Sequence, residues 1–267
     1  MSSKLLEIIG LTREFKLGNT TVKAVNDVNL SINKGEILGV VGESGSGKST
    51  LARIVMALDK PTEGNILFEN WDIFTQRAAH LRRMRANFQM VFQDPYGSLN
   101  PRHKIGRIVA EPLHLEKNAP KGKALRERVG VLLEEVGLSA ADMDKYPHEF
   151  SGGQRQRIAI ARALITKPKL LVADEATSAL DLTVQAQILK LILKMRDTHG
   201  ISVLFITHNI GVVDAICDSV AVMQSGKIVE AGPVRQVLDN PSKDYTKRLL
   251  SAELTLDTIG RKGRQVI

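Results

Sequence analysis

The stretch GESGSGKST, residues 42–50, constrains the fold of this 267-residue chain more than any other. It follows the apolar run 36–41, which is typical of a buried strand, and it precedes a helical pattern from Lys48 to about Leu58. A strand, a glycine-rich turn and a helix in this order form a phosphate loop, whose backbone amides point at phosphate oxygens. Residues 42–50, called the phosphate loop below, therefore predict a nucleotide site in an α/β fold.

The residue types in the phosphate loop each suit a contact with a nucleotide. Glycines permit backbone conformations that turn amides inward, a lysine adds a positive charge at the β and γ phosphates, and a serine hydroxyl is a ligand for Mg²⁺. The serine in question is Ser49. The residues that we expect to contact the nucleotide are Gly42, Ser44, Gly45, Ser46, Gly47, Lys48, Ser49 and Thr50.

A second candidate anion site lies in FSGGQ, residues 150–154, called the signature segment below. Ser151 stands three residues before Gln154, which predicts a capping box at the start of a helix. Gly152 and Gly153 would let a ligand approach the remaining amides, and the helix dipole favours negative charge there. This segment has no lysine, so the source of its anion is an open question.

Two adjacent carboxylates, Asp174 and Glu175, follow the apolar strand pattern LLVA. Adjacent acids at the end of a buried strand repel each other unless a cation or a reaction uses them. Beside a phosphate loop, we expect Asp174 to reach Mg²⁺ and Glu175 to activate the water that attacks the γ phosphate. The alternative is a solvated turn.

His208 and Gln93 also follow apolar strand patterns, at the ends where open α/β sheets bind ligands. His208 could instead cap a helix. The amide oxygen of Gln93 can bind a metal ion or water, although one glutamine taken alone is a weak signal.

Strand and helix patterns alternate along the chain, which predicts a mainly parallel sheet covered on both faces. The expected core and β subdomain comprise residues 4–93 and 167–235, and an inserted helical subdomain comprises residues 94–166. The tail, residues 236–267, ends in GRKGRQVI and is expected to be loosely held.

Charge and hydropathy narrow the class of protein. The net charge of +8 suggests an anionic partner such as nucleotide, nucleic acid or lipid head groups. The sequence lacks a run of about 18 apolar residues and a secretory signal, and its one cysteine, Cys217, suits a reducing compartment. We therefore expect a cytoplasmic protein.

The phosphate loop, Gln93, the signature segment, Asp174 with Glu175, SALD at 178–181 and His208 occur in the order typical of ATP-binding-cassette (ABC) ATPases, and the chain resembles that family over nearly its whole length. The resemblance implies a RecA-like P-loop NTPase core with an N-terminal antiparallel β subdomain and an inserted helical subdomain. It implies ATP and Mg²⁺ as ligands, with Ser49, Gln93 and Asp174 at the metal and with Glu175, Gln93 and His208 in catalysis.

In that family two cassettes pack head to tail around ATP. The resemblance therefore assigns Ser151, Gly152, Gly153 and Gln154 to the nucleotide of the opposing chain, and Asp181 to communication across the interface. Phe15 is the candidate for stacking on adenine, and a core aromatic is the alternative interpretation.

The segments 42–53, 89–102 and 240–252 resemble the ATPases of bacterial oligopeptide, dipeptide and nickel importers. This likeness implies a peripheral subunit at the cytoplasmic face of the cell membrane, with an identical or paralogous second ATPase, membrane permeases and, indirectly, an external solute-binding protein. Phe150 replaces a commoner leucine, and Ala176 follows Glu175 where proline is usual, which leaves that backbone less constrained.

Two other functions are alternatives to the importer ATPase. A cassette acting on nucleic acid or the ribosome would suit the basic charge, but the chain lacks long coiled coils, a second cassette and interleaved aromatic and basic residues. A regulatory cassette without activity is disfavoured by the presence of Glu175 and His208. We therefore expect no nucleic-acid partner.

Overall fold

The structure is a computed structural model that describes residues 4–18 and 20–257. Its contacts divide the chain into two compact units. Unit 1 combines Met1–Thr75 with Leu204–Ile267, and unit 2 is Gln76–Val203. The predicted helical subdomain, residues 94–166, falls within unit 2, which also includes residues 76–93 and 167–203.

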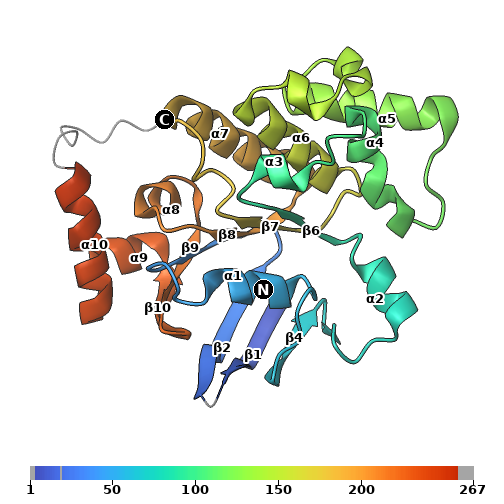
Figure 1. Cartoon of the computed structure of the whole chain (residues 1–267). Coiled ribbons are helices and arrows are strands. Elements are labelled where there is room, and N and C mark those ends of the chain that lie inside the picture. Colours follow the sequence, from blue (N-terminus) through green and yellow to red (C-terminus); the bar gives the residue numbers. More distant parts are fainter. Residues whose placement is uncertain (1–3, 19, 258–267) are drawn as a thin grey trace. The chain divides into compact units, whose positions relative to one another are not determined.

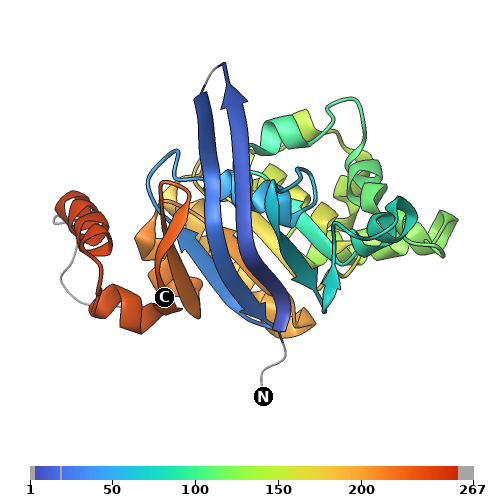
Figure 2. The same cartoon turned by 90° about the horizontal axis from the view of Figure 1, so that it is seen from below.

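Unit 1 contains a four-stranded sheet in the order β2-β1-β4-β5, with antiparallel pairing throughout. Its long β1–β2 hairpin is drawn in dark blue in Figure 2. Burial alternates along this part of β1, because Leu6 and Ile8 face the core whereas Glu7 and Ile9 do not. The strands are β1 (Lys4–Leu17), β2 (Thr20–Asn33), β4 (Glu63–Phe68) and β5 (Trp71–Asp72).

The unit 1 strands of a six-stranded sheet, in the order β10-β9-β3-β8-β7-β6, support the phosphate loop. Strand β3 (Ile37–Val41) is buried along its whole length and pairs in parallel with β9 (Ser219–Gln224), which pairs antiparallel with β10 (Lys227–Pro233). The phosphate loop connects β3 to the first helix (Figure 1). The helices of unit 1 are α1 (Lys48–Val55), α8 (Ile210–Ile216), α9 (Val234–Asp239) and α10 (Asp244–Asp257).

The tail differs from the loosely held segment expected from its polar composition. Residues 234–257 form α9 and α10, and the side chains of Val237 and Tyr245 are buried in a cluster of valines. Residues 258–267, with the basic GRKGRQVI, lie outside the described part of the chain.

Unit 2 combines a parallel strand pair with helices. β6 (Phe88–Val91) pairs with β7 (Leu170–Asp174), and the chain crosses into unit 1 within β8 (Ser202–Ile206). The α-helices are α2 (Ala78–Met84), α3 (Pro95–Ser98), α4 (Ile105–Ala110), α5 (Gly122–Glu135), α6 (Gly152–Leu164) and α7 (Leu182–His199). The 3₁₀ turns are η1 (Glu111–Leu115), η2 (Ala140–Asp144) and η3 (Pro147–Glu149).

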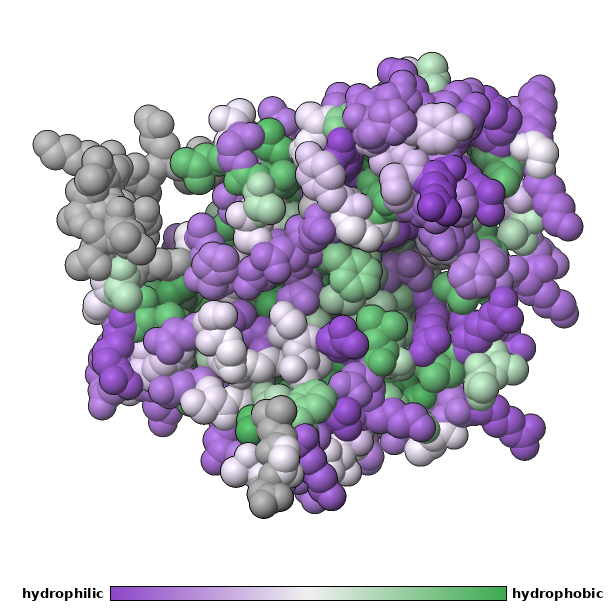
Figure 3. All heavy atoms as spheres, in the orientation of Figure 1, coloured by the Kyte–Doolittle hydropathy of each residue, from purple (hydrophilic) through white to green (hydrophobic). Residues whose placement is uncertain are grey.

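None of the described helices is both long and apolar enough to cross a bilayer. Hydrophilic side chains predominate among the coloured residues on the face drawn in Figure 3, with apolar ones between them in small groups. The apolar residues are instead concentrated inside each unit, where β3 and β8 are buried at every position.

Candidate functional site

The phosphate loop has a backbone that requires glycine at two positions. Gly42 has φ of 152° and Gly47 has φ of 107°. A Cβ atom at Gly42 would clash with the carbonyl oxygen of Met223, and one at Gly47 would clash with that of Ala24. The loop therefore lies directly against β9 and β2, and only glycine permits this approach.

Lys48 places its charge inside this loop. Its side chain is 5% exposed, and Nζ donates hydrogen bonds to the carbonyl oxygens of Gly42 at 2.7 Å and Glu43 at 2.8 Å. Gly47 is the N-cap of α1 and offers no side-chain acceptor to the amides of the first turn. A buried ammonium beside an uncapped helix N-terminus favours a polyanion.

Further contacts fix the shape of the loop. The amide of Gly226, in the turn after β9, donates to the carbonyl oxygen of Ser46 at 2.9 Å, and the amide of Ser46 donates to that of Glu43 at 3.2 Å. Ser44 and Ser49 are exposed at the surface of this cradle. The donor set and the glycines that the cradle requires fit the triphosphate of a nucleotide and a hydroxyl-ligated Mg²⁺.

Two other predicted residues lie in unit 1. His208 is exposed two residues after the end of β8, and the helix cap predicted as its alternative role is made by Asn209, whose side chain accepts from the amide of Val212. Phe15 is 36% exposed and lies under the Arg13 guanidinium, 4.6 Å from the ring centroid. The core interpretation of Phe15 is therefore wrong, whereas its contact with adenine stays a prediction.

Asp174 and Glu175 lie at the carboxyl end of β7 in unit 2, and both are half-buried. Glu175 has φ of 48°, a left-handed conformation that costs energy for a residue with a side chain. The next carbonyl, that of Ala176, accepts a hydrogen bond of 2.6 Å from Nε2 of Gln156. Helix α6 thus holds the turn that carries Glu175.

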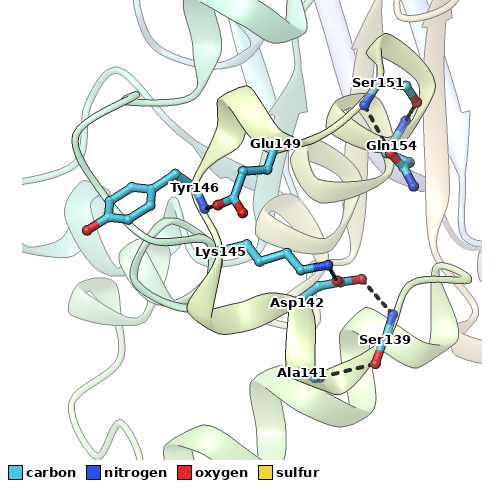
Figure 4. Close-up of polar contacts among 8 residues, drawn as sticks. All are labelled: Ser139, Ala141, Asp142, Lys145, Tyr146, Glu149, Ser151 and Gln154. Carbon is cyan, nitrogen blue, oxygen red and sulfur yellow. Dashed lines mark hydrogen bonds and ion pairs between the residues drawn. The ribbon is translucent and has the colours of Figure 1, made fainter.

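The signature segment forms the predicted capping box at the start of α6 (Figure 4). The amide of Ser151 donates to Oε1 of Gln154 at 2.9 Å, and the amide of Gln154 donates to Oγ of Ser151 at 3.4 Å. Both side chains lie at the surface. The box leaves the amides of Gly152 and Gly153 for other acceptors.

The structure brings the signature segment together with SALD. A Cβ atom at Gly153 would clash with Val184 of α7, and one at Gly152 would lie 4.0 Å from Leu180. Asp181 caps α7 by accepting from the amide of Val184 at 2.9 Å. Glycine at 153 is therefore required by packing between α6 and α7, in addition to any role at a ligand.

Gln93 is exposed between β6 and α3. The following residue, Asp94, caps α3 by accepting from the amides of Tyr96 and Gly97 at 2.8 and 3.0 Å. Tyr96 lies under the guanidinium of Arg155, 3.8 Å from the ring centroid. The segment after Gln93 is thereby tied to α6.

Gln156 is the residue that the sequence analysis missed. It is fully buried although it belongs to a polar residue type, and it connects α6 to the turn after Glu175. The available signal was a glutamine on the face of α6 that also carries the apolar Ala159 and Ala163. Its partner, 20 residues further along the chain, is not visible in that pattern.

Comparison with known proteins decides the family. The family model described as ABC transporter matches residues 25–178, more than half of the chain. This chain belongs to the ABC transporter family. The match begins in β2 and includes the phosphate loop, the signature segment and Glu175.

Two relatives show how far the similarity extends. The oligopeptide transport ATP-binding protein OppF of Bacillus subtilis is 46% identical over 253 residues, which cover 94% of this chain and 83% of that protein. The glutathione import ATP-binding protein GsiA of Salmonella choleraesuis is 44% identical over 270 residues, covering 98% of this chain and 43% of that protein.

Solved structures of ABC cassettes share the fold. A dimeric cassette, MJ0796, bound to ADP and Pi in a post-hydrolysis state, has a TM-score of 0.78 at 32% identity, covering 86% of this chain and 99% of that one. CbiO1 of Clostridium perfringens, part of the transporter complex cbiONQ, has a TM-score of 0.77 at 29% identity, with 95% of each chain covered. The predicted ABC ATPase fold and the predicted ATPase activity are confirmed.

Proposed function

We propose that this ABC ATPase is the ATP-hydrolysing subunit of a membrane importer for oligopeptides, dipeptides or a related small solute such as nickel, and that it acts at the cytoplasmic face of the cell membrane. The observation that carries the proposal is the phosphate loop, in which the buried ammonium of Lys48 is held beside the uncapped start of α1. Relatives named for oligopeptide and glutathione import support the choice of cargo class.

ATP would be bound by the phosphate loop, with Lys48 at its phosphates and Phe15 against the adenine. The loop amides and the ammonium together offer several charge-assisted hydrogen bonds, which are about twice as strong as neutral ones. The exposed ring of Phe15 suits a flat base on the side that Arg13 does not cover.

Mg²⁺ would be held by oxygen ligands from Ser49, Gln93 and Asp174, which are the hard donors that this ion prefers. The bound ion would neutralise charge on the phosphates. Asp174, at the end of β7, supplies the negative charge in this set.

For hydrolysis we assign Glu175 as the general base and His208 as a donor to the γ phosphate. The left-handed backbone of Glu175, kept in place by the bond from Gln156 to Ala176, fixes the direction of its carboxylate. The carbonyl that accepts this bond belongs to Ala176, at the position where the family resemblance implies a proline, and we expect activity to survive the replacement.

The second wall of the site would come from another cassette, identical or paralogous. Its Ser151, Gly152, Gly153 and Gln154 would cover the nucleotide, and Asp181 would couple the two halves. The amides left by the capping box support this assignment, as does the contact between the signature segment and SALD. One chain alone is then half of the enzyme.

The proposed assembly includes permease subunits and, through them, an external solute-binding protein. A cassette that acts on nucleic acid or the ribosome is the alternative. Two measurements distinguish these functions. An importer subunit co-purifies with permeases and has ATPase activity that RNA and DNA do not stimulate. A cassette acting on nucleic acid or the ribosome does not co-purify with permeases, and RNA or DNA stimulates its ATPase activity.

The decisive test of the chemistry is Glu175→Gln in the full chain, assayed with Mg²⁺ and ATP. We expect ATP binding to persist and turnover to fall at least about 100-fold, because a positioned general base contributes that much or more. Glu134→Gln makes the same change at an exposed position of α5 and should keep full turnover. Undiminished turnover in Glu175→Gln would remove Glu175 from the proposed role.

A further inference from the structure

The C-terminal helix α10 contacts the phosphate loop through one side chain. Tyr245, in the first turn of α10, accepts a hydrogen bond at its hydroxyl from the backbone amide of Glu43, over 3.3 Å. Glu43 is the second residue of the loop and lies 202 positions earlier in the chain. Tyr245 itself is 7% exposed, so its hydroxyl is held in place by packing.

The tyrosine ring belongs to a buried cluster that includes the end of β3. Val41, immediately before Gly42, is a member of this cluster, so α10 shares a buried cluster with the strand that leads into the loop. The other buried members are Val213, Val220, Val222, Val234 and Val237. Leu249, one helical turn after Tyr245, packs against the same cluster.

The start of α10 is fixed by a carboxylate from β10. Glu230 accepts hydrogen bonds from the amides of Ser242 at 2.7 Å and Lys243 at 3.2 Å. Desolvation raises the pKa of Glu230, but hydrogen bonds such as those from these amides outweigh it and hold the pKa at about 2. The carboxylate is thus charged at neutral pH and favours the helix N-terminus.

The contact of Tyr245 acts on the peptide group that holds Lys48. The carbonyl of Gly42 and the amide of Glu43 belong to one planar trans peptide, so they point in opposite directions. The carbonyl oxygen accepts from Nζ of Lys48 at 2.7 Å, and the amide donates to Tyr245. Tyr245 and Lys48 therefore hold the same peptide group, one through its amide and the other through its carbonyl.

We infer that Tyr245 is a positioning residue of the phosphate loop, through which the seating of α10 sets the affinity for nucleotide. Without its hydroxyl, the peptide between Gly42 and Glu43 can rotate, and the ammonium of Lys48 loses its fixed acceptor. This inference rests on the proposed function, because it requires the loop to bind ATP.

The test is Tyr245→Phe in the full chain, which removes the acceptor and keeps the buried ring. We expect the Kd for ATP to rise about 3- to 10-fold, the range that one net hydrogen bond gives. The KM for ATP should rise similarly while kcat changes little, and the unfolding midpoint should stay near that of the wild type. Tyr146→Phe deletes the same atom in unit 2 and should leave the Kd unchanged.

Hydrogen exchange in the wild-type protein provides a readout that does not depend on any variant folding. In the wild-type protein the Glu43 amide should be protected from exchange. In Tyr245→Phe, exchange at Glu43 should accelerate by at least about the same 3- to 10-fold, while amides of β3 keep their protection. An unprotected Glu43 amide in the wild type would overturn the inference.

Lys48→Ala separates the inference from the function on which it rests. If Lys48→Ala weakens ATP binding and Tyr245→Phe does not, the positioning role of Tyr245 is wrong and the proposed site stands. If Lys48→Ala binds ATP like the wild type, the proposed site itself is wrong.

Discussion

The two helices that begin with glycine-rich turns, α1 and α6, differ at their N-termini. Helix α1 begins at Lys48 behind a glycine N-cap and has a buried ammonium within its loop. Helix α6 begins behind Ser151 and closes a complete capping box with Gln154. The start of α1 concentrates positive charge, whereas the start of α6 has neutral donors and exposed side chains.

Under the proposed two-chain arrangement, this difference explains how two similar-looking segments could serve one polyanion. A triphosphate needs a strong countercharge to be bound at all, and the phosphate loop supplies it through Lys48. The start of α6 can add only amides and its dipole, which are each worth up to about 1 kcal/mol at an exposed site. It is therefore suited to cover an anion already neutralised elsewhere, as the two-chain proposal requires.

The largest effect should come from adding a Cβ to the loop. Gly42→Ala forces alanine into φ of 152° and against the carbonyl oxygen of Met223, and we expect ATP affinity to fall at least about 100-fold. Gly45→Ala is the matched variant, because Gly45 has φ of 80° but open space at its Cβ, and its loss should be clearly smaller. Equal losses, measured by titration calorimetry, would contradict the close-approach argument.

Ser151→Arg should separate the two helix starts functionally. The arginine brings bulk and charge into the proposed phosphate site of the partner, so ATP-driven dimerisation should be lost while each chain still binds ATP. Ser151→Ala removes only the cap and should lower the free energy of unfolding by about 1 kcal/mol. Light scattering with and without ATP measures the dimerisation of both variants. Loss of ATP binding by monomeric Ser151→Arg would refute the half-site arrangement.

A more moderate effect is expected where α6 meets α7. Gly153→Ala overlaps Val184, and such overpacking should lower the free energy of unfolding by about 1 to 3 kcal/mol. The double variant Gly153→Ala with Val184→Ala has a shorter side chain at position 184. Adding Gly153→Ala to Val184→Ala should therefore cost less stability than adding it to the wild type. Urea unfolding measures the coupling between the two sites, and strictly additive changes would show that the contact carries no strain.

The smallest expected effect concerns the carboxylate of Glu230, which holds the start of α10. Because the pKa of Glu230 is lowered to about 2 from an ordinary value of 4.5, its carboxylate stabilises the folded protein above pH 4.5. This stability should be lost as the pH falls from about 4.5 toward 2. Glu230→Gln should lack this component, and hydrogen exchange of residues 242–252 across the pH range is the measurement.

Local spacing alone predicted much of this protein. The phosphate loop, the strands around residues 37–41 and 170–174 and the capping box of Ser151 with Gln154 are all present in the structure. Each depends on residues within about one turn or one strand of each other, so a linear pattern contains the information.

Other features were decided by the tertiary structure. The bond from Gln156 to Ala176, the clash that keeps position 153 a glycine and the contact of Tyr245 with Glu43 join residues that are far apart in sequence. The tail forms two helices because Val237 and Tyr245 find a valine cluster built by β3, α8 and β9. Sequence sets the local backbone and the available chemistry, whereas burial and pairing depend on which distant surfaces the packed chain brings into contact.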